Sequence, residues 1–270
     1  KVALWVYLMK GVEVTNIGAG LWEVRQGDLR HLWMGSSFVR VGDSESQMRV
    51  LFENYIASLQ ANGCTLSEDC IRTWIFVQNV DVNYAGIVKA RREVFEDEGL
   101  TAQTHYIAST GIAGRNAYPD SSVIMDAYAV AGLAKDQIRY IYGSTHLNPT
   151  YEYGVTFERG TAVDYPDRCQ VFISGTASID NKGQIVHPGN VSKQCERLLE
   201  NVSVLLSEAE CGFEDVMSMI VYLRDISDYQ NVRHIFDSRY PDIPKVYLWA
   251  PVCRPGWLVE MECIALKKLQ

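Results

Sequence analysis

The sequence has no long apolar segment, no excess of positive charge and no paired-cysteine motif. No run of apolar residues approaches the roughly 20 that cross a bilayer, and the longest, such as 127–134, have the length of buried strands. We therefore expect no membrane partner. With 25 Lys and Arg against 33 Asp and Glu, the net charge is -8. This acidic balance disfavours a nucleic-acid partner.

The seven cysteines form no C-x-x-C pair, and most of them lie in apolar segments. An odd number of such cysteines favours free thiols in a reducing compartment, so we expect a cytoplasmic protein. Their spacing fits no structural zinc site, and Gly18-Ala-Gly20 lacks the rest of a dinucleotide fingerprint. The sequence therefore predicts no metal and no cofactor. What precedes Lys1 stays open.

An internal repeat divides the 270 residues, which are enough for one large or two medium domains. Residues 47–77 and 191–223 each read as an amphipathic helix, a turn and a strand. A second helix and two closing strands follow in each copy, with the closing strands over 106–112, 123–130, 247–252 and 258–266. Helices gathered on one face of a mixed sheet make the expected class α+β.

The repeat predicts three segments along the chain. We expect a degenerate N-terminal domain over 1–135, an aromatic-rich connector over 136–155 and a C-terminal domain over 156–270. The tyrosines of the connector predict that it packs on the body of the protein instead of forming a flexible linker.

Several motifs of the second copy resemble the YjgF-like reactive-intermediate deaminase (Rid) superfamily. They are Val171-Phe-Ile-Ser-Gly-Thr-Ala-Ser-Ile179, Leu-Leu-Glu-Asn201, Ile220-Val-Tyr-Leu-Arg-Asp225 and Val259-Glu-Met-Glu-Cys-Ile-Ala265. The resemblance covers nearly all of the second copy and, more loosely, 47–132. It implies two tandem YjgF-like (chorismate-mutase-like) units, each a mixed sheet with two helices on one face. Because Rid domains usually form trimers, it also leaves open a homotrimer or a monomer whose tandem domains imitate an oligomer.

The resemblance is strongest to the two-domain chorismatases. Members of the deaminase branch hold the substrate carboxylate with an arginine near the start of the penultimate strand, where this sequence has Val246. The chorismatase pattern is matched in order by Arg72-Thr-Trp74, Ser109-Thr-Gly-Ile112, Phe157-Glu-Arg159, Gly175-Thr-Ala177, His187-Pro-Gly189 and Leu258-Val-Glu260. It implies release of pyruvate from chorismate, a dicarboxylate, to give 3-hydroxybenzoate or a dihydroxycyclohexadiene carboxylate.

Glu260 matches the catalytic glutamate of that branch. Because side chains alternate along a strand, Glu260, Glu262 and Ile264 share one face. In the first copy Ile124 corresponds to Glu260 and Asp126 to Glu262. The acid at the first position therefore occurs in one copy only, which predicts one kind of site, and we expect a structural role for Glu262.

Further candidates surround Glu260. Cys253 and Gly175 match residues of the hydroxybenzoate-forming subgroup, and the competing interpretation of Cys253 is a small buried side chain. The candidate substrate-binding groups are the guanidiniums of Arg91, Arg159, Arg254 and Arg72 and the hydroxyl of Tyr153. For each arginine the competing interpretation is a surface position.

Two other functions stay open: a Rid-type imine or enamine deaminase, and a non-catalytic module that binds a small aromatic or carboxylate metabolite. The segment Thr150–Thr156 replaces a Pro-Arg-Pro-Pro stretch with which chorismatases bind substrate. The exact substrate and product therefore stay open as well.

Overall fold

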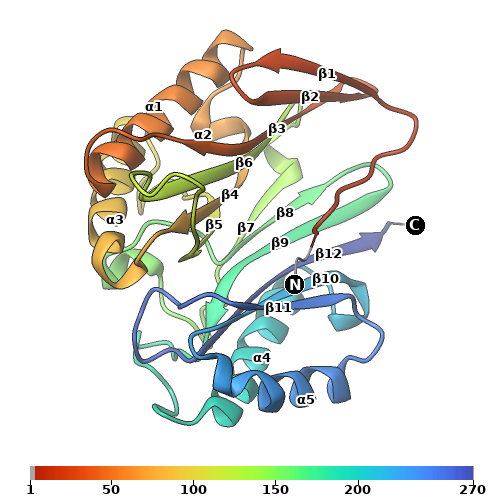
Figure 1. Cartoon of the computed structure of the whole chain (residues 1–270). Coiled ribbons are helices and arrows are strands. Elements are labelled where there is room, and N and C mark those ends of the chain that lie inside the picture. Colours follow the sequence, from red (N-terminus) through yellow and green to blue (C-terminus); the bar gives the residue numbers. More distant parts are fainter. Residues whose placement is uncertain (1–3, 270) are drawn as a thin grey trace.

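The first copy of the repeat forms a six-stranded mixed sheet with its long helices on one face (Figure 1). The computed structural model describes residues 4–269. The elements are β1 (Glu13–Gly18), β2 (Leu21–Gln26), β3 (Leu29–Phe38), α1 (Ser44–Ala61), α2 (Leu66–Asp69), β4 (Cys70–Val77), α3 (Val80–Asp97), β5 (Ala108–Ala113) and β6 (Val123–Ala131). The strand order is β1-β2-β3-β6-β4-β5, and β4 and β5 run parallel.

The second copy forms a second six-stranded sheet with the order β11-β10-β12-β9-β8-β7. Its elements are η1 (Lys135–Gln137), β7 (Ile138–Ile141), η2 (Thr150–Tyr153), β8 (Gly160–Asp164), β9 (Arg168–Ala177), α4 (Val191–Glu208), η3 (Phe213–Asp215), β10 (Val216–Leu223), η4 (Ile226–Asp228), α5 (Tyr229–Arg239), β11 (Lys245–Trp249) and β12 (Val259–Lys268). The predicted α+β class, with two tandem units, is confirmed.

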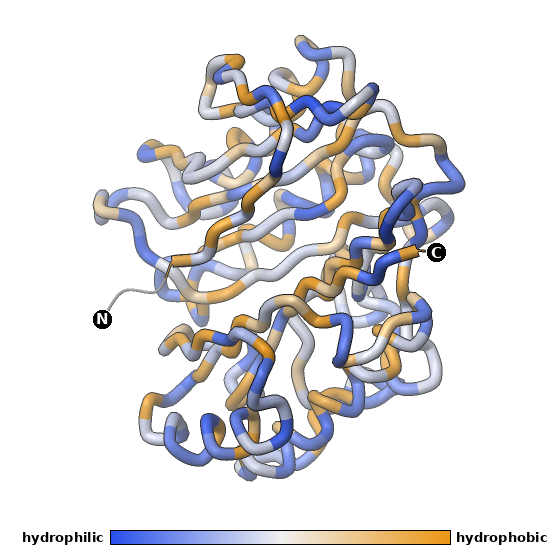
Figure 2. The backbone as a smooth tube through the Cα atoms, turned by 90° about the vertical axis from the view of Figure 1, so that its right-hand side faces the viewer, coloured by the Kyte–Doolittle hydropathy of each residue, from blue (hydrophilic) through white to orange (hydrophobic). Residues whose placement is uncertain are grey.

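Helix α1 shows why the helices cover the sheets. The side chain of Asp43 accepts a hydrogen bond from the Ser46 N–H (2.9 Å) and so caps the first turn. Met48, Phe52 and Tyr55 recur at helical spacing and are buried against the sheet. Hydrophobic and hydrophilic residues alternate along the helices in Figure 2, as expected for elements with one face in the core.

The two sheets repeat the same register. Phe76 and Trp74 of β4 pair with Ile124 and Asp126 of β6, while Tyr222 and Ile220 of β10 pair with Glu260 and Glu262 of β12. The predicted correspondence of Ile124 with Glu260, and of Asp126 with Glu262, is therefore confirmed.

Two details differ from the expectations from sequence. The residues expected to form a connector, 136–155, include β7, which pairs with β8 and so belongs to the second sheet. Strand β11 begins two residues before the expected start at 247, because Lys245 and Val246 already pair in parallel with Met219 and Ile220 of β10.

The two units pack through the helix-free faces of their sheets. Strand β5, at the edge of the first sheet, lies against β8 and β9, and the Glu158 N–H donates to the Ile107 carbonyl (3.1 Å). Tyr128 of the first sheet and Phe172 of the second share an apolar cluster, with ring centroids 5.6 Å apart. Across residues 4–269 no helix combines the length and the apolar character of a membrane span.

Candidate active site

A small pocket lies at this boundary between the two units. Both units contribute to its walls, the first through α3 and β5 and the second through β9, β12 and the loop before β12. Seven of the eight residues expected from sequence line it, namely Glu260, Cys253, Arg91, Arg159, Arg254, Gly175 and Tyr153. The packing of the two units therefore brings together residues that are far apart in the chain.

Glu260 lies on β12 with only 4% of its surface exposed. Burial, together with the nearby carboxylate of Glu262, raises the pKa of Glu260 to about 8. A carboxyl group with this pKa is mostly protonated at neutral pH and can act as a general acid.

Gly175 makes room for this carboxyl group. A Cβ atom at position 175 would overlap Oε1 of Glu260. The register between β12 and β9 shifts between Met261 and Cys263, which forms a bulge beside Gly175. Bulges of this kind change the direction of nearby side chains, and here the bulge accompanies the close approach of Glu260 to β9.

Three guanidiniums surround the pocket without a carboxylate partner. Among residues 4–269, Arg91, Arg159 and Arg254 form no ion pair. Arg91 is 1% exposed and Arg159 is 4% exposed. Nε and Nη2 of Arg91 and Nε of Arg159 have no hydrogen-bond partner in the described part of the chain. Because unpaired buried charges are costly, the arrangement favours an anionic ligand.

Aromatic rings hold these cations in place. The guanidinium carbon of Arg254 lies 4.4 Å from the centre of the Tyr153 ring and 4.9 Å from that of Trp257. Arg159 lies 5.4 Å from the Tyr153 ring. Such cation–π contacts fix the position of a guanidinium without neutralising its charge.

Cys253 is a neutral thiol in this setting. Burial, followed by the charge of Glu260, raises the pKa of Cys253 to about 12. Because the thiolate is the nucleophilic form, this raised pKa argues against Cys253 as a nucleophile. A protonated thiol can still contact a bound ring and donate a weak hydrogen bond.

Arg72, which the sequence predicts to bind substrate, does not line this pocket. Its buried guanidinium forms an ion pair with Glu262 (2.5 Å) and donates to the Ser174 hydroxyl (3.1 Å). Thr110 also donates to Glu262 and accepts a hydrogen bond from the Gly175 N–H (3.0 Å). Arg72 thus holds the wall behind Gly175, and Glu262 has the structural role expected for it.

Tyr84 and Trp257, which are not among the residues predicted from sequence, also line the pocket. Tyr84 lies on α3 seven residues before Arg91, and residues at this spacing lie on the same face of a helix. This spacing could have identified Tyr84 as a pocket residue. Trp257 gives no such signal, because it lies in the loop between β11 and β12.

The free space in the pocket is about 30 Å³, which is close to the volume of one water molecule. Tyr153, Val155 and Phe157 are among the residues that line it. A ligand with a six-membered ring is larger than this free space.

This two-unit fold, with a pocket at the boundary that both units line, is that of a tandem YjgF-like protein. A family model described as endoribonuclease L-PSP matches residues 162–267. The RutC family protein UK114 of Drosophila melanogaster is 31% identical over 98 residues, covering 36% of this chain and 71% of that protein. The chain therefore belongs to the RutC (YjgF-like, Rid) family.

Other relatives have more specific names. A 3-hydroxybenzoate synthase of Streptomyces hygroscopicus is 36% identical over 107 residues, which are 36% of this chain and 31% of that protein. A 2-iminobutanoate/2-iminopropanoate deaminase of Rattus norvegicus is 30% identical over 100 residues, covering 36% of this chain and 72% of that protein. A crystal structure of a chorismatase has a TM-score of 0.76 at 22% identity over 94% of this chain and 79% of that chain. This last likeness covers both units and shows that they share one fold with it.

Proposed function

We propose that the protein is a chorismatase-like enzyme that releases pyruvate from chorismate and leaves 3-hydroxybenzoate. The observation that carries the proposal is a buried carboxyl group, Glu260, with a pKa of about 8 in a pocket edged by three guanidiniums that have no carboxylate partner among residues 4–269. The relative named 3-hydroxybenzoate synthase and the shared fold of the chorismatase support the same assignment.

The chemistry needs an acid and cations. Chorismate carries two carboxylates, and its enolpyruvyl ether leaves as pyruvate after a proton is added to the methylene carbon. Protonated Glu260 supplies that proton, and the new C–H bond turns the enolpyruvyl group into an oxocarbenium ion. The bond between the ether oxygen and the ring then breaks, so this oxygen leaves as the keto oxygen of pyruvate. The neighbouring ring hydroxyl supplies the oxygen of the phenol and returns its proton to Glu260. Arg91, Arg159 and Arg254 bind the carboxylates, because guanidiniums form strong charge-assisted hydrogen bonds with such groups.

The two candidate products differ by one water. 3-Hydroxybenzoate and pyruvate together contain the atoms of chorismate, whereas the dihydroxycyclohexadiene carboxylate and pyruvate contain those of chorismate and one water. The protonated thiol of Cys253, together with the small Gly175, favours the first outcome in this proposal by keeping the space beside the ring apolar.

Incubation of the protein with chorismate tests the proposal. Pyruvate is followed with lactate dehydrogenase and NADH, and the aromatic product is identified by chromatography. We expect pyruvate from the wild-type protein and almost none from Glu260→Gln, whose side chain is similar in shape but has no acidic proton. Pyruvate formation no faster than that of this variant would refute the enzyme assignment.

Deamination of a small imine is the second candidate, because a relative named as a deaminase matches the second unit. Val246 lies on β11 at the position expected for the carboxylate-binding arginine, and it does not line the Glu260 pocket. Hydrolysis of 2-iminopropanoate with no pyruvate from chorismate would favour this function. Tight binding of chorismate or 3-hydroxybenzoate without turnover would instead indicate a binding module.

A further inference from the structure

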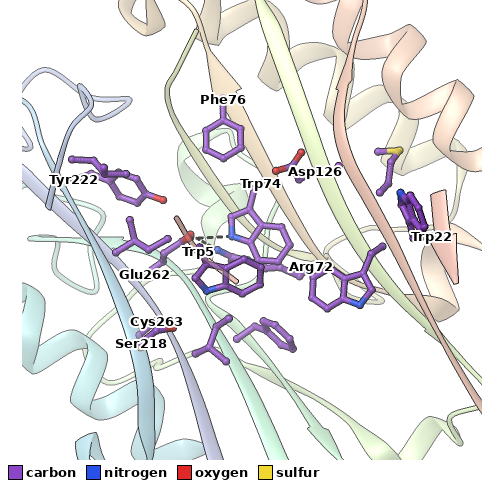
Figure 3. Close-up of a pocket in the computed structure, with 17 residues that line it drawn as sticks. Trp5, Trp22, Arg72, Trp74, Phe76, Asp126, Ser218, Tyr222, Glu262 and Cys263 are labelled. Carbon is purple, nitrogen blue, oxygen red and sulfur yellow. Dashed lines mark hydrogen bonds and ion pairs between the residues drawn. The ribbon is translucent and has the colours of Figure 1, made fainter. Parts of the chain in front are cut away.

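A second and larger cavity, of about 490 Å³, lies between the helix-free faces of the two sheets (Figure 3). It shares no lining residue with the Glu260 pocket. Its volume is within the range of cavities that bind small molecules, about 300–1,000 Å³. The proposed reaction does not use it.

Tryptophan side chains form much of its wall. Trp22 of β2 pairs with Trp33 of β3, and Trp33 stacks on Tyr128 with a centroid distance of 4.0 Å. The ring of Trp5 lies 6.2 Å from the rings of both Trp33 and Trp74. Trp5 and Trp22 are 41% and 47% exposed at the rim. Exposed aromatic side chains around a cavity are typical of a binding site.

Two carboxylates, of Glu262 and Asp126, and one guanidinium, of Arg72, line this cavity. Arg72 is paired with Glu262, whose other oxygen accepts a hydrogen bond from Trp74 Nε1 (3.1 Å). Asp126 has no ion pair among residues 4–269, and its one hydrogen bond in the described structure is from the Ser36 N–H (2.5 Å) to Oδ1. Asp126 thus lines an aromatic cavity whose one guanidinium among the described residues, that of Arg72, pairs with Glu262 and lies 5.1 Å from the centre of the Trp74 ring (Figure 3).

The two units differ at the position of Arg72, the residue that pairs with Glu262. Trp74 pairs with Asp126 and Ile220 pairs with Glu262, so Trp74 and Ile220 occupy equivalent positions in the two sheets. Arg72 and Ser218 each lie two residues before them and are therefore equivalent as well. Glu262 and Asp126 are equivalent as well. The first unit therefore provides a guanidinium at this position, which pairs with the carboxylate of the second unit, whereas the second unit has a serine at the equivalent position.

We propose that this cavity binds an organic cation, a substituted ammonium ion with a hydrophobic body. The positive group lies against Asp126 and the tryptophan faces, and the hydrophobic body contacts the apolar side chains of the second sheet, such as Ile220 and Leu248. Indole rings attract cations more strongly than other aromatic side chains do, and the attraction grows when the cation is removed from water.

The test compares two molecules of the same shape. Phenyltrimethylammonium carries a positive charge, and tert-butylbenzene is its neutral counterpart. Binding of each to the full chain is measured by isothermal titration calorimetry and by quenching of tryptophan fluorescence. We expect the cation to bind at least roughly tenfold more tightly, which a cation–π contact combined with one carboxylate provides. Equal binding of the two molecules, or no binding of the cation, would overturn the proposal.

Three variants locate the binding. Asp126→Asn keeps an acceptor for the Ser36 N–H but removes the charge, and we expect it to lose the roughly tenfold preference for the cation. Trp22→Leu, at the exposed rim, should weaken binding of the cation several-fold more than binding of tert-butylbenzene, because it removes the aromatic face but keeps apolar surface. Asp97→Asn, on the exposed end of α3, makes the same change in net charge away from the cavity and should have no effect. An unchanged preference in Asp126→Asn would also overturn the proposal.

Discussion

Replacing Glu260 by glutamine should change how the stability of the protein depends on pH. Glu260 is buried, and its pKa is raised from 4.5 to about 8. The folded state therefore keeps a proton that the unfolded state releases once the pH exceeds 4.5. The stabilising effect of the bound proton is complete below pH 4.5 and is lost as the pH rises through 8.

The size of the effect follows from the two pKa values. An increase from 4.5 to about 8 corresponds to a total of about 5 kcal/mol in the free energy of unfolding. Between pH 5 and pH 8 the expected loss is about 3 to 4 kcal/mol. Glutamine does not titrate, so the variant lacks this contribution.

Urea denaturation followed by circular dichroism at pH 5, 6, 7 and 8 measures the effect. Burial also raises the pKa of Glu158, to about 7, but Glu158 is present in both proteins and its contribution cancels in the difference. We expect the unfolding free energy of the wild type to fall relative to that of Glu260→Gln by about 3 to 4 kcal/mol from pH 5 to pH 8. A difference that stays constant with pH would show that Glu260 titrates normally, and the general-acid argument would fail with it.

Four further predictions concern the proposed reaction. Gly175→Ala places a methyl group where Oε1 of Glu260 lies, so kcat for pyruvate release should fall by roughly 10- to 100-fold while the circular dichroism spectrum stays unchanged. Arg91→Met removes an incompletely paired buried cation, so the variant should unfold at a higher temperature in a melting experiment but show a raised KM for chorismate. Cys253→Ser should keep pyruvate release within a few-fold of the wild-type rate and alter the ratio of the two aromatic products, measured by chromatography, because the thiol is protonated and takes no part as a nucleophile. The rate of the wild-type enzyme should decline as the pH rises above about 8, since Glu260 then loses its proton, and a rate that increases through this range would contradict the assignment.

The repeat made much of the fold predictable from sequence. Apolar positions at helical spacing and alternating strands occur in the same order in both copies, and each copy folds as that order predicts. The four residues of β7 were missed because so short a segment becomes a strand only through its partner β8. The boundaries of β11 shifted for a similar reason, since its pairing with β10 decides where it begins.

Sequence could predict only those residues of the candidate site that stand out individually along the chain. Glu260 was a candidate because it matches the catalytic glutamate of the chorismatases, and because the first copy has no acid at the corresponding position. Arg72 and Arg91 could not be separated by sequence, since both are arginines in amphipathic segments of the first unit. Their difference arises from the packing of the two units, which places Glu262 beside Arg72, whereas Arg91 forms no ion pair within the described part of the chain.

The two cavities follow from the same duplication. At one pair of equivalent positions the second unit has Glu260 and the first has Ile124, so a protonated acid is present only on the side that faces the buried arginines. At the next pair both units keep a carboxylate, but among residues 4–269 only Glu262 pairs with a guanidinium, that of Arg72, and the second unit has Ser218 at the position equivalent to Arg72. Two sheets with one register thus give two different sites, and the difference between them depends on which side chain the opposite unit contributes. Substitution at Ser218 should therefore affect the tryptophan-lined cavity and leave the Glu260 pocket unchanged, since Ser218 lines only the former.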